Sequence, residues 1–203
     1  MFSRIRKKID EKIKISDKVW DLVETVLYCV AALILAYLIV TFVGQRTVVD
    51  GESMYNTLND GDNIIVEKLS YTFGSPERFD IIVFPHYDEF RGEEVYYIKR
   101  IIGMPGDTLQ IKNGLIYLID ENGNKNILEE EYGYYRGGLL MQSGIASSPI
   151  TIPEGYYFVL GDNRNNSKDS RDASVGLVKG EDIMGKAWLR FYPFSDFGFI
   201  THK

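Results

Sequence analysis

An uncharged apolar run, Val26–Val43, constrains this chain more than any other feature of its sequence. At about 1.5 Å per helical residue, the run comes close to the ~30 Å hydrocarbon thickness of a bilayer. Trp20 and Tyr28 lie near its start, where amphipathic rings suit the headgroup region. The run therefore predicts one transmembrane helix, and a buried helix of a soluble protein is the alternative.

The run differs from a cleavable secretory signal, whose apolar core is only about 7–15 residues long and ends at a small-residue cut site. Here the core is longer and continues into Phe42-Val43-Gly44-Gln45-Arg46, which contains no Ala-x-Ala. We therefore expect residues 19–43 to be an uncleaved transmembrane signal anchor. Residues 44–203 are then one domain of ordinary size, since domains most often have roughly 100–150 residues.

Charge on the two sides of the run predicts its orientation. Residues 1–18 carry seven basic and three acidic side chains, a net charge of +4, whereas Arg46 is the only basic residue between the run and Lys68. Lysine and arginine are enriched on the cytoplasmic side of a membrane helix. We therefore expect a basic cytoplasmic tail at 1–18 and a single-pass type II protein of the cell membrane, with residues 44–203 outside the cytoplasm.

The composition of residues 44–203 argues against several classes of function. Their 16 basic and 24 acidic side chains give a net charge of −8 and no electrostatic footprint for nucleic acid, although the basic tail could contact anionic lipid of the bilayer. The one cysteine, Cys29, lies in the predicted helix, so we expect no disulfide and no thiolate site in the domain. Because His86 and His202 are far apart in sequence, we expect no metal centre, and no cofactor.

After the anchor, short β-branched and aromatic segments alternate with Gly, Asn, Asp and Pro, which is typical of strands and turns. We expect a mainly β domain with antiparallel sheet. The predicted strands are Thr47–Val49, Asn63–Glu67, Ile81–Phe84, Val95–Ile102, Thr108–Ile111, Leu115–Ile119, Tyr156–Leu160 and Met184–Tyr192. Two Asn-Gly pairs predict a hairpin meander over 108–128, and 129–149 lack periodicity, so about 108–150 should form a small inserted hairpin and loop region.

Three segments of the domain contain residue types that can perform chemistry. The first, Gly51–Leu58, has Ser53 in a Gly-rich turn, where most serines only hydrogen-bond local backbone. A serine nucleophile needs a base, and His86 lies in Phe84–Asp88, which we interpret as a surface turn. The alternative base is a lysine kept neutral by burial, which requires its pKa to fall from about 10.4 to roughly 7–8.

Lys99, in the second segment, fits that requirement. Side chains alternate along a strand, so Lys99 shares a face with Tyr97 and Ile101. Burial among such neighbours disfavours the ammonium form. The other interpretation is a solvent-facing strand lysine that discourages edge-to-edge aggregation.

The third segment is the polar loop Gly161–Arg171, which follows an apolar strand. Its density of Asp, Asn and Ser is also typical of turns, and Asp162-x-Asn-x-Asn could indicate a calcium loop. The EF-hand pattern is not met, because no Gly stands at the sixth position and no Glu closes the loop.

In this order and behind an anchor, the segments resemble the type I signal peptidase family. The family pattern is Ser-Met-x-Pro-Thr-Leu, an Arg-x-Asp strand, Tyr-x-Lys-Arg-x-x-Gly-x-Pro-Gly-Asp, and Gly-Asp-Asn-Arg-x-x-Ser-x-Asp-Ser-Arg. The matching segments here are Ser53–Leu58, Arg78–Phe84, Tyr97–Asp107 and Gly161–Arg171. The resemblance extends from the anchor to about Trp188 and leaves out the insertion and the C-terminal end.

The resemblance implies a membrane-bound serine endopeptidase that removes N-terminal signal peptides from exported preproteins. It would cut after small residues through an acyl-enzyme, with Ser53 attacking the scissile carbonyl and Lys99 serving as base and then as proton donor to the leaving amine. The resemblance also implies supporting roles: Ser167 orients the lysine amine, and the pairs Asp162 with Arg100 and Asp169 with Arg171 hold the polar loop against the catalytic strand.

The sequence departs from the family pattern at two positions. Asn56 replaces the usual proline, and Gly51 stands where some members carry a hydroxyl thought to help the oxyanion. The backbone N–H of Ser53 would then carry more of the oxyanion stabilisation. Ser53 follows Val43, the end of the apolar run, by only ten residues. Because an extended chain covers at most about 3.3–3.6 Å per residue, Ser53 must lie within roughly 35 Å of the outer membrane surface, close to where a signal is cut.

Other functions fit part of these patterns. A catalytically silent, membrane-tethered β-domain that binds exported chains would require the intact Ser53 and Lys99 to be relics. A self-cleaving Ser–Lys protease of the LexA-like kind is related in fold, but the anchor and the lack of a DNA-binding segment argue against it. A sortase-like transpeptidase needs an exported cysteine, and the penicillin-binding pattern Ser-x-x-Lys fails at Asn56.

Overall fold

The computed structural model describes residues 16–38, 44–89 and 91–202, and the chain divides into two compact units, Met1–Val43 and Gly44–Lys203. In the first unit, helix α2 spans Asp17–Leu38 and begins slightly before the predicted anchor. Its segment Asp17–Tyr37 is long and apolar enough to cross a membrane. Most of the predicted tail, residues 1–15, and the last predicted anchor residues, 39–43, lie outside the described residues.

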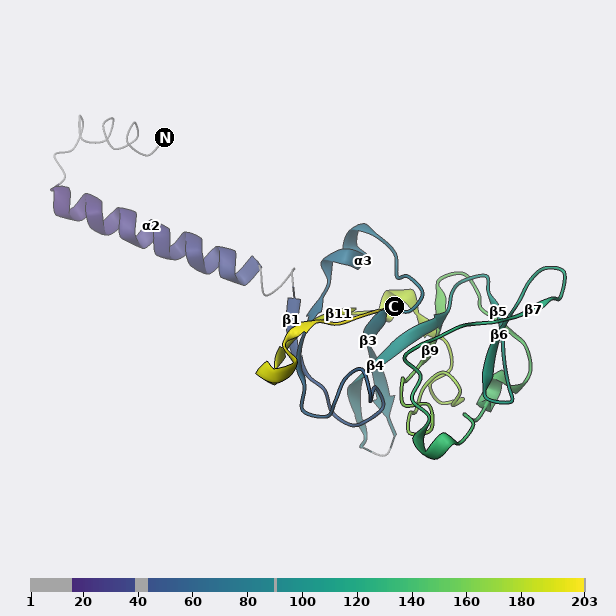
Figure 1. Ribbon diagram of the computed structural model, residues 1–203. Helices are drawn as coiled ribbons and strands as arrows, with labels where there is room; N and C mark the ends of the chain where they lie inside the picture. The colour runs from purple at the N-terminus through teal and green to yellow at the C-terminus, as the bar shows by residue number, and fades with distance from the viewer. Residues whose placement is uncertain (1–15, 39–43, 90, 203) are drawn as a thin grey trace. The chain divides into compact units, whose positions relative to one another are not determined.

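The second unit is built mainly from antiparallel strands, which confirms the predicted fold class (Figure 1). Its larger sheet has eight strands in the order β1-β2-β11-β3-β4-β9-β10, with β12 paired to β11. The bounds are β1 Gly44–Val48, β2 Asn63–Glu67, β3 Ile81–Asp88, β4 Glu93–Gly103, β9 Tyr156–Leu160, β10 Val178–Lys179, β11 Gly185–Tyr192 and β12 Gly198–Phe199.

The smaller sheet has four strands in the order β7-β6-β5-β8 and contains the predicted meander. Its strands are β5 Thr108–Lys112, β6 Leu115–Ile119, β7 Lys125–Ile127 and β8 Ile150–Thr151. Asn113 and Gly114, with φ of 52° and 76°, join β5 to β6. Both values are positive, as a type I′ turn requires, so the Asn-Gly prediction is confirmed here.

The short elements are those that the sequence analysis missed. Helix α3 spans Leu69–Phe73, and the 3-10 turns are η2 Arg136–Gly138, η3 Gly144–Ser147, η4 Gly180–Asp182 and η5 Phe194–Asp196. The strands β8, β10 and β12 have two residues each. Elements of this length are too short to show the periodicity that identifies longer strands and helices.

His86 does not lie in a surface turn, as the sequence predicted, but inside β3, which continues to Asp88. Its half-buried ring lies 4.6 Å from the Tyr97 ring between centroids. Strand β11 pairs with β3 only as far as Val83. Pro85 is therefore at a position where its missing N–H removes no ladder hydrogen bond on that side.

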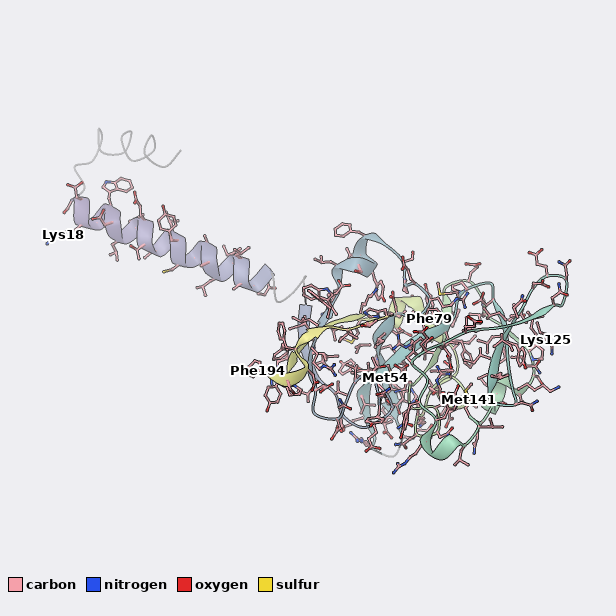
Figure 2. All side chains as sticks on the ribbon, viewed as in Figure 1. Lys18, Met54, Phe79, Lys125, Met141 and Phe194 are labelled. Atoms are coloured by element: carbon pink, nitrogen blue, oxygen red, sulfur yellow. The ribbon has the colours of Figure 1, made fainter. Side chains whose placement is uncertain are left out.

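The turn after β1 is fixed by buried apolar side chains that follow Ser53. Met54 is 1% exposed and Leu58 is fully buried, and both belong to a core cluster with Ile64 and Val83 of the large sheet. Figure 2 shows Met54 inside the domain, whereas Phe194, on the C-terminal segment, lies at its surface. Burying such side chains contributes about 1.5–3 kcal/mol each, so the turn cannot move without exposing them to water.

Gly185 and Gly198 test how tightly the large sheet is packed. A Cβ at Gly185 would overlap the carbonyl oxygen of Glu67 on β2, whereas a Cβ at Gly198 would meet nothing within 4 Å. We expect Gly185→Ala to lower the free energy of unfolding by about 1–3 kcal/mol, because a backbone atom cannot yield as a flexible side chain does.

Urea unfolding of the detergent-solubilised protein measures this difference, with Gly198→Ala as the matched control. That control should be neutral or slightly stabilising, since alanine loses less conformational entropy than glycine in a strand. Equal effects of the two substitutions would mean that β11 and β2 are not packed as closely as described.

Candidate active site

Ser53 lies half-buried in a turn whose backbone is held from two directions. The turn begins at Gly51, which has a φ of 91° and donates its N–H to Asp60 Oδ1 at 2.8 Å. From the polar loop, Asn163 donates its backbone N–H to the Ser53 carbonyl at 3.0 Å and its side-chain amide to the Glu52 carbonyl at 3.1 Å. The hydroxyl is therefore presented by a fixed backbone.

Lys99 extends from β4 to this hydroxyl. Its side chain is buried, with the residue only 3% exposed. The Nζ donates to Ser53 Oγ at 2.8 Å and to the Ile98 carbonyl at 2.9 Å. It lies 4.8 Å from the centroid of the Tyr97 ring, which confirms that these two residues share a face of β4.

Burial lowers the pKa of Lys99 to about 8, because removal from water disfavours the charged amine. Asp169 and Asp162 raise this pKa, but their effect is smaller than that of burial. Each of these carboxylates is paired with an arginine of its own, Arg171 and Arg100, at 2.7 Å. A sizeable neutral fraction of the amine is therefore present near pH 8.

The pair Arg100 and Asp162 connects three parts of the site. Arg100 Nε and Nη2 donate to the two oxygens of Asp162 at 2.8 and 2.7 Å, and both side chains are buried. Thr57 Oγ1, from the turn that carries Ser53, donates to the same carboxylate at 2.5 Å. Strand β4, the turn and the start of the polar loop are thus joined at one carboxylate.

The pair Asp169 and Arg171 shapes the polar loop from within. Arg171 Nε and Nη2 donate to the Asp169 carboxylate at 2.8 and 2.7 Å, and the Gly161 N–H donates to it at 3.0 Å. Ser170 Oγ accepts the Val159 N–H of β9 at 2.9 Å. The two predicted ion pairs therefore both form, and this one closes the loop on the end of β9.

Ser167 lies near the Ser53 turn but makes no hydrogen bond to Lys99. Its Oγ is buried without a partner among the described residues. A Cβ at Gly161 would overlap both the Ser167 Oγ and the Ser53 carbonyl oxygen, so the two serines are packed around this glycine. The structure thus brings Ser167 to the site without the contact to the amine that the sequence led us to expect.

The sequence analysis missed a buried pair, Arg164 and Glu130, which joins the insertion to the polar loop. Arg164 Nη1 and Nη2 donate to the two Glu130 oxygens, the second at 2.6 Å. The Tyr132 ring lies 3.8 Å from the Arg100 guanidinium, and the Tyr134 N–H donates to the Asp162 carbonyl at 2.7 Å. Glu130 lies in a segment without periodicity, so no sequence pattern pointed to it. The one available signal was Arg164, a charged residue in the polar loop that would need an acidic partner if buried.

His86 is a second nitrogen base on β3, which pairs with the strand of Lys99. Burial, followed by the charge of Lys168, lowers its pKa, and its ring stacks on Tyr97. It is Lys99, however, whose nitrogen contacts Ser53 Oγ. Within residues 16–38, 44–89 and 91–202, no group of three His, Cys, Asp or Glu side chains could hold a metal ion.

Comparisons with known proteins identify relatives over most of the chain. Residues 22–192 match the family described as "Signal peptidase, peptidase S26". The chain is 38% identical to the signal peptidase I S of Bacillus subtilis (strain 168), over 82% of this chain and 87% of that protein. It is 37% identical to the probable signal peptidase I-2 of Synechocystis, over 85% of this chain and 74% of that protein. The crystal structure of a signal peptidase I from Enterococcus faecalis V583 is 36% identical, with a TM-score of 0.41 over 55% of this chain and 96% of the other.

Asn56 offers a test of the turn that presents Ser53. It is exposed, its φ is not positive, and its N–H takes part in no backbone hydrogen bond with the described residues. We therefore expect Asn56→Pro to raise the free energy of unfolding by about 0.4–1 kcal/mol, because proline restricts the unfolded chain. Thermal unfolding measures the change.

Asn59→Pro is the matched control for this substitution. The Asn59 N–H donates to Asp62 Oδ2 at 2.9 Å, so proline at residue 59 removes a hydrogen bond and should lower the melting temperature. A lower melting temperature for Asn56→Pro as well would show that residue 56 has a conformation that proline cannot adopt.

Proposed function

We propose that this chain, which belongs to the signal peptidase family of S26 peptidases, uses Ser53 as its nucleophile and Lys99 as its general base. Its membership and its relatives make it a serine endopeptidase that removes signal peptides from preproteins. The observation that supports the two roles is the 2.8 Å contact between Ser53 Oγ and the buried Lys99 Nζ.

The chemistry starts from the neutral amine. With Lys99 deprotonated, the Ser53 hydroxyl can donate its proton to Nζ while Oγ forms a bond to the scissile carbonyl carbon. The ammonium then returns this proton to the leaving amine as the carbon–nitrogen bond breaks, which leaves an ester on Ser53. Water then attacks the ester and passes a proton to Lys99, which returns it to Ser53 Oγ as the ester bond breaks, so the signal peptide leaves as a carboxylic acid.

The backbone N–H of Ser53 is the candidate donor to the oxyanion. It makes no hydrogen bond to the described residues, so it is free to bind the negative oxygen that forms during attack. Gly51, two residues earlier, has no side chain to contribute a second donor. Because Gly51 lacks the hydroxyl that some family members carry at this position, we expect the Ser53 N–H to carry more of the oxyanion stabilisation.

The remaining polar residues support the dyad by position. We assign Asp162 with Arg100, and Asp169 with Arg171, to holding the polar loop against β4. We assign Ser167 to orienting the Lys99 amine, because its Oγ is buried and unpaired beside the Ser53 turn.

The apolar helix and the family together support membrane association, and we propose a specific topology. Residues 1–18 lie in the cytoplasm, α2 crosses the lipid bilayer of the cell membrane, and 44–203 lie outside, as the charge difference across the helix favours. The short connection to Ser53 then keeps the dyad near the membrane surface, where signal peptides end. Cleavage after small residues follows from the family resemblance.

Ser53→Ala and Lys99→Ala should each lower kcat/KM for a synthetic preprotein by at least about 10³-fold, since each removes one half of a dyad. The double variant should be no slower than either single one, because the two groups act as a unit. Mass spectrometry of the products locates the cut.

Lys112→Ala, which removes an exposed lysine of β5, is the control and should cleave at the wild-type rate. Near-normal cleavage by Lys99→Ala would disprove the assignment of the base. Near-normal cleavage by Ser53→Ala would disprove that of the nucleophile.

Protease accessibility tests the topology. In intact cells without their wall, added protease should digest residues 44–203 and spare the basic tail, whereas permeabilised cells should lose both. An epitope tag at each end of the chain reports which part survives. Survival of the large domain in intact cells would overturn the proposed orientation.

A further inference from the structure

A cleft of about 450 Å³ lies between the insertion and the polar loop, and Ser167 of its lining packs with the Ser53 carbonyl around Gly161. One wall includes Leu139 and Leu140 of the insertion, and the other includes Arg164, Asn165 and Ser167. Asn165 donates its side-chain amide to the Leu139 carbonyl at 2.9 Å, which ties the two walls together at one end. The insertion thus forms part of a site that the catalytic segments alone would not make.

Two polar groups in the wall of this cleft lack partners. Arg164 is 1% exposed, and its Nε has no hydrogen bond although both Nη atoms bind Glu130. The Ser167 Oγ is unpaired as well. Both atoms are shielded from water, so a ligand in the cleft meets the exposed side chains of its lining instead, among them Gln142 and Asn165. Their amides can hydrogen-bond a peptide backbone. An extended peptide offers a carbonyl at every residue.

The large sheet shows which part of a peptide could reach the cleft. Along the edge of β4 that faces away from β3, pairing with β9 starts only at Arg100 in the part of the chain that the structure describes. The earlier residues of that edge, up to Lys99, can accept an added strand. A peptide added there must leave the sheet at Ser53 and Lys99, because β9 occupies the edge beyond, and its continuation meets the polar loop.

A preprotein has different residues before and after the cut, and the protein surface differs correspondingly between the edge of β4 and the cleft. The end of a signal peptide is apolar with small residues at the cut, which suits the sheet edge beside Tyr97 and Ile98. The residues after the cut vary between preproteins. They suit a cleft whose arginines are already paired with Glu130 and Asp169, and whose exposed charged side chain is Asp172.

We propose that this cleft binds the first residues of the mature chain, those that follow the cut, as an extended segment. The proposal rests on the function proposed above. Leu139 and Leu140, which are 67% and 68% exposed, form the rim over which this segment passes. The rim side chains therefore face the substrate's side chains.

Substitutions that place a negative or a positive charge at Leu139, on the rim of the cleft, test the proposal. Leu139→Glu and Leu139→Lys are compared on preproteins that carry either Lys or Glu at the second to fourth positions after the cut. Leu139→Glu should raise kcat/KM for the lysine substrates relative to the glutamate substrates by about twofold to fivefold, and Leu139→Lys should reverse this preference. The preference should fade in high salt, because exposed charges are screened.

Three controls separate the outcomes. Ile127→Glu makes the same exchange on exposed β7, outside the cleft, and should leave the preference unchanged. Substrates with the charges placed before the cut should show no exchange of preference. If they do, while substrates charged after the cut do not, the cleft holds the signal side and the proposal is wrong.

Cleavage with no exchange of preference in either substrate series would also overturn the proposal, while leaving the proposed function intact. Absence of cleavage by the unmodified protein would instead remove the proposed function itself, and with it the basis of this inference. Because Leu139 is largely exposed, both variants should fold, and thermal unfolding verifies that they do.

Discussion

Desolvation of the Lys99 amine sets a condition that the surrounding residues have to meet. A lysine in water is charged at neutral pH and cannot accept a proton, so its environment must disfavour the ammonium. Here β4 places Nζ in the domain interior, within hydrogen-bond distance of Ser53 Oγ. The core cluster around Met54 and Leu58 holds the serine at that distance, so the packing of the turn and the burial of the amine act together.

Two acidic side chains close to the amine could defeat this arrangement, because each favours the charged lysine. Asp162 and Asp169 are both buried, and both raise the pKa of Lys99. Their pairing with Arg100 and Arg171 balances this charge and satisfies their oxygens, as buried carboxylates require. Glu130 does the same for Arg164, so the insertion contributes to the charge balance of the polar loop. Removing one member of such a pair typically costs about 3–5 kcal/mol.

Much of this arrangement could be predicted from the sequence. The longer strands were predicted because alternation and Asn-Gly turns are local signals, and β2, β6 and β9 have the expected bounds. The ion pairs Arg100–Asp162 and Arg171–Asp169 followed from the family resemblance. The sequence failed where distant segments meet. His86 lies in a strand because β4 pairs with it, and Glu130 reaches Arg164 across a loop whose path no local pattern encodes. The unpaired Ser167 hydroxyl could be found only from the packing around Gly161.

The most direct test of the account is a titration of the Lys99 amine itself. With lysines labelled at Cε and Nζ, nuclear magnetic resonance of the detergent-solubilised protein follows each amine from about pH 6 to pH 11. The Lys99 signal is identified by its loss in Lys99→Arg. Since burial dominates, the account predicts a pKa of about 8, with the neutral amine, and so the competent base, increasing as pH rises through that value. A pKa at or above the usual lysine value of about 10.4 would contradict it, because the amine would then be charged wherever the protein works.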